Sequence, residues 1–144
     1  MKAAVDSSVL VAALDGGDPD HEACRKLLLA EKLHARPHAL SETFSTLTGG
    51  RLAIRISAED AAKILRQQMA PRLKISELSE SDLLEAFDES QRRGVRGGAI
   101  YDFLHLVAAR KAGAKKFYTL NLDDFRSFHR SGDPEIAQPS VEDV

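Results

Sequence analysis

The sequence predicts an α/β fold built on a parallel sheet, and two observations lead to this prediction. Short apolar runs typical of strands alternate along the chain with longer segments that have helical spacing of apolar residues. Capping residues, glycines and prolines separate these segments. Strands that alternate with helices of about 10–15 residues are typical of a parallel sheet.

The predicted strands are short. The first, at residues 2–5, runs directly into Asp6. We expect further strands at residues 33–36, 73–78 and 116–120. The polar stretch 131–144 allows at most one edge strand, near residues 135–138.

Several of the predicted helices begin at capping signals. These signals are Asp18 followed by Pro19, Ser57 with Asp60, and Ser79 with Asp82. The expected helices lie at residues 7–14, 19–32, 37–48, after 57, 79–93, 99–112 and 123–128. We expect the helix that follows Ser79 to bury Leu83, Leu84 and Phe87.

Length and composition predict one globular domain over residues 1–144. A chain of 144 residues is near the commonest domain size, and 43% apolar with 29% charged residues is an ordinary globular mixture. The single cysteine, Cys24, excludes an internal disulfide and a metal site built on cysteines. A reducing compartment fits this cysteine content best.

We expect a soluble cytoplasmic protein with no membrane partner. Asp6 places a carboxylate where a signal peptide would have its apolar region. The longest apolar run covers six residues, 9–14, whereas about 20 are needed to cross a bilayer.

Positive charge is concentrated in residues 92–130. This stretch contains nine basic and three acidic residues, a net charge of +6, while the other eleven basic and nineteen acidic residues give −8. A basic zone in an acidic chain can attract a polyanion to one face. Charge alone favours the alternative, a solvated helix surface.

Four acidic residues lie where a parallel sheet gathers ligand groups. Asp6 follows the first strand, and Asp124 follows a later one. Asp102 and Glu42 lie near the starts of predicted helices. Because ligands bind at the carboxyl ends of the strands in such sheets, these acids are candidates for one shared site.

Each acid also has a structural interpretation, which is the favoured one when the residue is considered alone. Asp6 is placed to cap the next helix, and Asp102 lies in a first turn, where negative charge is favourable. Asp124 and Asn121 have the spacing of a capping pair, and Glu42 is explained by solvation. Only the occurrence of all four acids at such positions favours a shared functional site.

Clustered carboxylates without a nearby cationic side chain raise their own pKa values. A hard divalent cation relieves this repulsion, and carboxylate oxygens suit Mg²⁺ or Mn²⁺. In phosphodiester hydrolysis such an ion binds a phosphate oxygen, lowers the pKa of a water and stabilises the leaving oxygen. Flanking phosphates would be held by the basic residues that precede Asp102, namely Arg92, Arg93 and Arg96.

The four acids lie in short motifs with a recognisable order. Residues 5–10, 41–48, 98–105 and 119–125 read VDSSVL, SETFSTLT, GAIYDFLH and TLNLDDF. Together they resemble the PIN domain ribonucleases, and among them the VapC-type toxins of bacterial toxin–antitoxin pairs. Each motif alone is weak, but the full set, in the family's order and spanning nearly the whole chain, is fairly specific.

The resemblance implies a PIN fold, a central parallel sheet of about four or five strands flanked by helices. It implies an endoribonuclease that depends on Mg²⁺ or Mn²⁺ and cuts structured RNA such as a transfer RNA or a ribosomal RNA loop. Asp6 and Asp102 match acids that bind the metal directly, and Glu42 matches one that acts directly or through water. Ser7 and Thr119 match hydroxyl positions that orient ligands or water.

The sequence departs from the family pattern at the fourth acidic position. Asn121 stands where the family often has an acid, so Asp124, just before Phe125, is the choice for the fourth carboxylate. A neutral Asn121 implies a looser second metal site. His105, three residues after Asp102, is expected to pack between helices, with a hydrogen bond to the site as the alternative.

The resemblance also implies protein partners: a second copy of the chain and a small antitoxin. The antitoxin's C-terminal segment would wrap the toxin and insert an arginine into the acidic pocket. Candidates for its groove are apolar residues of the first two helices, Val11, Leu14, Leu27 and Leu28. Ordinary core packing is the alternative interpretation of these residues.

Other functional classes fit less well. A non-catalytic PIN-like scaffold that binds RNA or protein would be favoured by loss of the acids, and only the position of Asn121 has lost one. A PIN nuclease that is not a toxin remains open. A phosphatase of the haloacid type needs an aspartate where Ser8 stands, and a receiver-like domain needs paired acids on the first strand.

Overall fold

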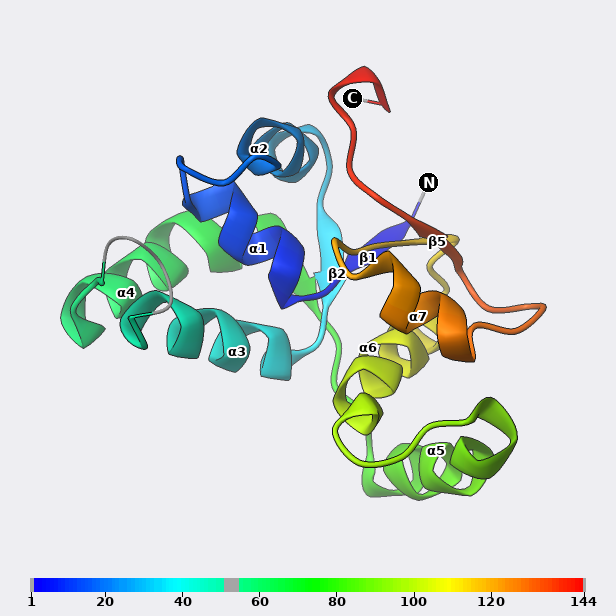
Figure 1. The fold of residues 1–144 in the computed structure, drawn as a ribbon. Coiled ribbons are helices and arrows are strands. Elements are labelled where there is room, and N and C mark those ends of the chain that lie inside the picture. The colour runs from blue at the N-terminus through cyan, green and yellow to red at the C-terminus, as the bar shows by residue number, and fades with distance from the viewer. Residues whose placement is uncertain (1, 51–54, 144) are drawn as a thin grey trace.

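The chain folds around a parallel sheet of five short strands, ordered β3-β2-β1-β4-β5 (Figure 1). This computed structural model describes residues 2–50 and 55–143. The strands are β1 (Ala3–Val5), β2 (Leu33–Ala35), β3 (Leu73–Ile75), β4 (Lys116–Tyr118) and β5 (Glu135–Ala137). All four pairings are parallel, which confirms the predicted fold class and the edge strand near the C-terminus.

Helices join the strands. After β1 come α1 (Ser7–Leu14) and α2 (His21–Ala30), and after β2 come α3 (Pro37–Thr48), α4 (Ala58–Ile64), the π-helical turn η1 (Leu65–Met69) and the 3₁₀ turn η2 (Ala70–Arg72). After β3 come α5 (Glu80–Arg93) and α6 (Ala99–Lys111), and after β4 comes α7 (Leu122–Phe128). A last 3₁₀ turn, η3 (Val141–Asp143), follows β5. In the described part of the chain, no helix combines the length and apolarity that a bilayer crossing requires.

The two faces of the sheet are covered by different helices. Side chains alternate along a strand, so Ala3 and Val5 pack into one apolar cluster with α1, α2 and β2. Ala4 and Phe117 point to the opposite face, into a cluster with α6 and α7. Cys24 is buried in the first cluster, as a small core residue.

Two of the three predicted capping signals are present in the structure, but the one at Asp18 and Pro19 is wrong, because α2 begins only at His21, with Asp20 as its N-cap and no side-chain cap. The Ser57 side chain accepts a hydrogen bond from the backbone of Asp60, and Ser79 and Asp82 form a complete capping box. Gly94 ends α5 in the left-handed region, with φ of +70°, which a glycine adopts without a Cβ clash.

The prediction that α5 buries Leu84 and Phe87 is wrong, because these side chains are 53% and 49% exposed. The helix meets the core through a narrower stripe, in which Ala86 is buried and Leu83 is partly buried. Leu84 and Phe87 directly follow Leu83 and Ala86, and one residue along a helix is a rotation of about 100°. Their side chains therefore point away from the core.

Candidate active site

Asp6 is fixed at the point where β1 passes into α1. It is only 2% exposed, and it caps α1 by accepting a hydrogen bond from the Ser8 backbone nitrogen at 3.1 Å. The same oxygen, Oδ1, accepts from Ser8 Oγ at 2.5 Å, and Oδ2 accepts from Thr119 Oγ1 at 2.8 Å. Asp6 therefore takes the predicted capping role and also joins the start of α1 to the end of β4.

Two hydroxyl groups tie the ends of β1 and β4 together around Asp6. Ser8 Oγ accepts from the Leu120 backbone nitrogen at 3.0 Å, and Thr119 Oγ1 accepts from the Asn121 nitrogen at 3.0 Å. Ser8, which holds Asp6, was not among the predicted site residues, whereas Ser7 was predicted for the first hydroxyl position. An N-cap side chain bonds the second or third helical residue, and this rule indicates Ser8.

Glu42 reaches the site from α3. Its Oε1 lies 2.7 Å from His105 Nε2 on α6, its Oε2 lies 3.9 Å from His38 Nε2, and Ser7 donates a further hydrogen bond to it. Burial acts to raise the pKa of Glu42, but its hydrogen bond with His105 and the charges of His105 and His38 outweigh burial and lower that pKa. Both interpretations of His105 hold, because the residue is buried, at 3% exposure, and also makes the hydrogen bond to the site.

Asp102 lies in the first turn of α6 as a half-buried carboxylate. Its side chain makes no hydrogen bond or ion pair with any of the residues described. Burial, together with the negative charges of Asp6, Glu42 and Asp124, raises its pKa to about 6 against the opposing effect of His105. The other three predicted acids therefore lie close enough to Asp102 to repel its charge.

Asp124 and Asn121 lie at the start of α7. Both are exposed, and Asn121 makes no side-chain cap, so the predicted capping pair does not form. Asp124 contributes a carboxylate that no side chain neutralises in the described parts of the chain.

The carboxylates fit a hard divalent cation by the chemistry of their donors. Asp102 and Asp124 are oxygen donors without a counter-charge, beside a buried Asp6, which is the environment that such an ion stabilises. Within residues 2–50 and 55–143, no three acidic, histidine or cysteine side chains are already arranged to hold an ion. Binding would thus require side-chain rotation, chiefly of the half-buried and exposed acids.

Of the three predicted RNA-binding arginines, Arg92 and Arg96 are exposed at the end of α5 and in the following loop. Arg93 is different: its guanidinium pairs with Asp133 and Glu89 and lies 5.3 Å from the centre of the Phe103 ring. Its charge is used inside the protein, so we do not include Arg93 in an RNA-binding surface.

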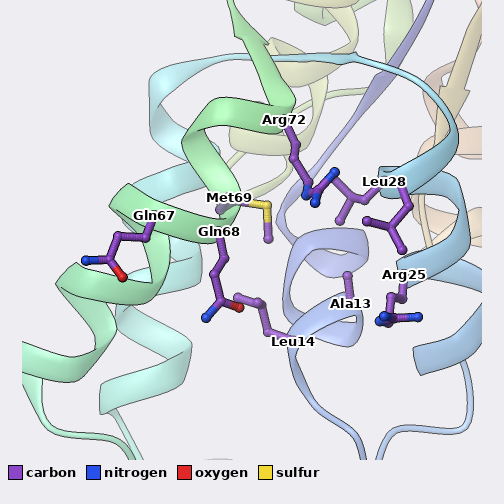
Figure 2. Close-up of a pocket in the computed structure, with 9 residues that line it drawn as sticks. Ala13, Leu14, Arg25, Leu28, Gln67, Gln68, Met69 and Arg72 are labelled. Carbon is purple, nitrogen blue, oxygen red and sulfur yellow. The ribbon is translucent and has the colours of Figure 1, made fainter.

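A separate hollow of about 250 Å³ lies between α1, α2 and η1 (Figure 2). Leu14 and Leu28, two of the predicted groove residues, line it, and Met69 lies across from Leu28. Leu27 and Leu28 are both buried in the core, as the alternative interpretation held, although Leu28 also reaches the wall of the hollow. Arg25 and Arg72 also line the hollow, beside its apolar residues.

Comparison with known proteins agrees with this architecture. The sequence model of the PIN domain matches residues 3–130. Ribonuclease VapC27 of Mycobacterium tuberculosis is 30% identical over 112 residues, which cover 78% of this chain and 80% of that protein.

Solved structures share the fold. VapC20 of Mycobacterium tuberculosis, a sarcin-ricin loop cleaving toxin, superposes with a TM-score of 0.69 at 21% identity, covering 92% of this chain and all of that one. VapBC2 of Rickettsia felis, bound to a DNA fragment from its promoter, superposes with a TM-score of 0.67 at 16% identity. The match covers 97% of this chain and 100% of that one. A toxin–antitoxin complex of Klebsiella pneumoniae superposes with a TM-score of 0.63 at 18% identity. The match covers 97% of this chain and 98% of the chain in that complex.

The chain belongs to the PIN domain family. Its 30%-identical relative is a VapC protein, and the predicted resemblance to VapC-type proteins is confirmed.

Proposed function

We propose that this protein is an endoribonuclease dependent on Mg²⁺ or Mn²⁺ that hydrolyses phosphodiester bonds of structured RNA. The observation that carries the proposal is the approach of three carboxylates from separate elements, Asp6, Glu42 and Asp124, to Asp102, where their charges add to burial in raising its pKa to about 6. Such an excess of negative charge is unfavourable for folding alone and is explained by a bound cation.

We assign distinct roles to the side chains of the site. Asp6 and Asp102 bind the cation directly, Glu42 binds directly or through water, and Asp124 is the fourth carboxylate. The ion, when bound, supplies positive charge to the phosphate and a water of lowered pKa. The chain's own contribution is position: Thr119 and Ser8 hold both oxygens of Asp6, and His105 holds Glu42.

The names of the relatives support RNA as the substrate and toxin as the biological role. One is a ribonuclease and another is a toxin that cleaves the sarcin-ricin loop. We therefore propose a cytoplasmic toxin that acts on transfer RNA or ribosomal RNA. A non-catalytic scaffold is disfavoured because the acids are present and only Asn121 departs from the pattern.

We further propose an antitoxin partner and a homodimer, in keeping with the toxin–antitoxin complexes that share this fold. The hollow beside Leu14 and Leu28 is where we place the antitoxin, because Leu29, which also lines it, is 47% exposed and Leu14 is partly exposed. We also propose that residues 1–144 are one domain, since β5 completes the sheet beyond the matched region.

The direct test is cleavage of structured RNA by the purified protein. We expect cleavage with Mg²⁺ or Mn²⁺, loss of cleavage in EDTA and recovery when the metal is restored in excess, followed by gel electrophoresis of a labelled RNA. Cleavage that persists in EDTA would contradict the metal dependence. Binding without cleavage in every metal would favour the scaffold.

Metal affinity should depend on pH through Asp102. Because its pKa is raised to about 6, Asp102 takes up a proton as the pH falls through 6, and the cation must displace this proton. We expect affinity for Mn²⁺, measured by calorimetry without RNA, to fall about tenfold between pH 7 and pH 5 for one such proton. The Asp102→Asn variant should bind more weakly and with less pH dependence, whereas an affinity that is constant over this range would contradict the assignment.

The exposed arginines should contribute to RNA affinity electrostatically. We expect Arg92→Ala and Arg96→Ala each to lower the slope of log affinity against log salt concentration by about one, because each removes a phosphate contact. The matched control is Arg66→Ala, an exposed arginine in η1. If the salt dependence of RNA affinity is the same for all three variants and the parent protein, Arg92 and Arg96 do not contact the RNA.

A further inference from the structure

One aromatic side chain beside the acids is unusually open to solvent. Tyr101 directly precedes Asp102 in the first turn of α6, and 54% of it is exposed. Large aromatic side chains gain stability mainly by burial, so folding alone does not explain this position.

Tyr101 is nevertheless held in place. Its ring stacks on that of His38, with centroids 5.5 Å apart and planes only 16° from parallel. His38 lies in the first turn of α3, and its Nε2 is 3.9 Å from Glu42 Oε2. The stacked pair therefore joins two helix starts and is adjacent to two of the proposed metal-binding acids.

The pair lies beside a polar hollow. His38 and Glu42 line a cavity of about 520 Å³ together with small hydroxyl side chains, Ser7, Ser41, Ser45 and Thr46, and with Gly49. Hydroxyl groups can donate to and accept from the edges of bases and from sugar hydroxyls. An apolar peptide side chain would find few apolar partners among these lining residues.

We propose that Tyr101, supported by His38, is a stacking surface for an unpaired nucleobase next to the phosphate to be cleaved. The proposal rests on the proposed function, and it defines the substrate class: RNA whose nucleotide at this position is unstacked from its neighbours. Proteins that recognise single-stranded RNA commonly stack its bases on aromatic rings. A duplex does not offer a free base face to Tyr101.

Binding without cleavage separates this inference from the nuclease activity. The protein carries Asp6→Asn throughout, the buffer contains EDTA, and the probe is a single-stranded oligoribonucleotide with one 2-aminopurine. We compare Tyr101→Leu, which loses the ring but keeps apolar volume, with Tyr101→Phe, which keeps the ring. Phe87→Leu is the matched control, since Phe87 is 49% exposed on α5 and has no aromatic partner among the described residues.

We expect Tyr101→Leu to weaken binding about tenfold and to abolish the stacking change in 2-aminopurine fluorescence. Tyr101→Phe should retain both signals, and Phe87→Leu should match the parent protein. An abasic oligomer of the same length should bind Tyr101→Leu and the parent protein equally. Full binding and unchanged fluorescence in Tyr101→Leu would overturn the proposal, as would an equal loss for the abasic oligomer.

The outcomes also separate the two proposals. Suppose that the unmodified protein, with Asp6, never cleaves RNA, yet the Tyr101 variants bind as expected. The proposed nuclease function is then rejected and the stacking surface is supported. If cleavage occurs and the tyrosine series is flat, the stacking surface alone is rejected. Absence of RNA binding by every variant, together with absence of cleavage by the protein with Asp6 restored and metal present, would reject both.

Discussion

The Asp6→Asn variant is expected to cleave RNA at least about a hundredfold more slowly than the parent protein while keeping its fold. Asparagine has the same shape but removes one negative charge from the proposed metal site, and a weakened metal site commonly costs this factor or more. Its amide oxygen can still accept from Thr119 or Ser8, so the junction between β1 and β4 remains connected. Initial rates at saturating Mn²⁺ measure the loss.

The stability of this variant gives an independent readout. Burial raises the pKa of Asp6. When the pKa of a carboxyl is higher in the folded than in the unfolded protein, the unfolded chain loses its proton first as the pH rises. The free energy of unfolding therefore decreases as the pH rises above the pKa of the unfolded state. Asparagine does not ionise, so we expect the free energy of unfolding of Asp6→Asn at pH 7 without metal to equal or exceed that of the parent protein.

Asp123→Asn is the matched control. Asp123 has the same chemistry, is exposed and lies beside Asp124, but has no proposed role in the site. Its cleavage rate should stay within about twofold of the parent rate. Full activity in Asp6→Asn would exclude Asp6 as a ligand, and a large loss in Asp123→Asn would show that net charge near α7, rather than ligation, is what matters.

Much of the fold was predictable because its determinants are local. The capping residues at Ser57 and Ser79 act over three positions, and their helices begin where the sequence indicates. The position of Asp6 at the end of β1 follows from an apolar run that stops at a carboxylate. Strand ends then collect at one edge of a parallel sheet, and this rule alone brings Asp6 and Thr119 together.

The features that sequence reasoning missed join residues far apart in the chain. Glu42 and His105 are 63 positions apart, and whether the packed His105 also makes a hydrogen bond to Glu42 depends on how α3 and α6 approach. Likewise, the three arginines before Asp102 have similar sequence surroundings. Only the tertiary fold places Asp133 against Arg93 and leaves Arg92 and Arg96 in solvent.

Arg93→Met is expected to destabilise the protein by about 3 kcal/mol. The Arg93 side chain is 11% exposed and that of Asp133 only 3%, so the substitution leaves a largely buried carboxylate without its main partner. Arg93 also donates to the Phe128 carbonyl at 3.2 Å, linking α5 to the end of α7. Its hydrogen bond lowers the pKa of Asp133 in spite of burial, which acts in the opposite direction. This contribution to stability is present above the unfolded pKa of Asp133 and is lost as the pH falls through its lowered folded value.

Urea denaturation of Arg93→Met and of Arg92→Met, one position earlier on the same helix, separates fold from RNA binding. Arg92 is exposed, so Arg92→Met should change the free energy of unfolding by no more than about 0.5 kcal/mol. Adding Asp133→Asn to Arg93→Met should recover part of the lost stability, because it removes the unpaired charge, although Asp133 still has Arg110 3.5 Å away as a partial partner. Equal stability of the two single variants would mean that the pair with Asp133 contributes no net stability, and Arg93 would then return as a candidate for the RNA surface.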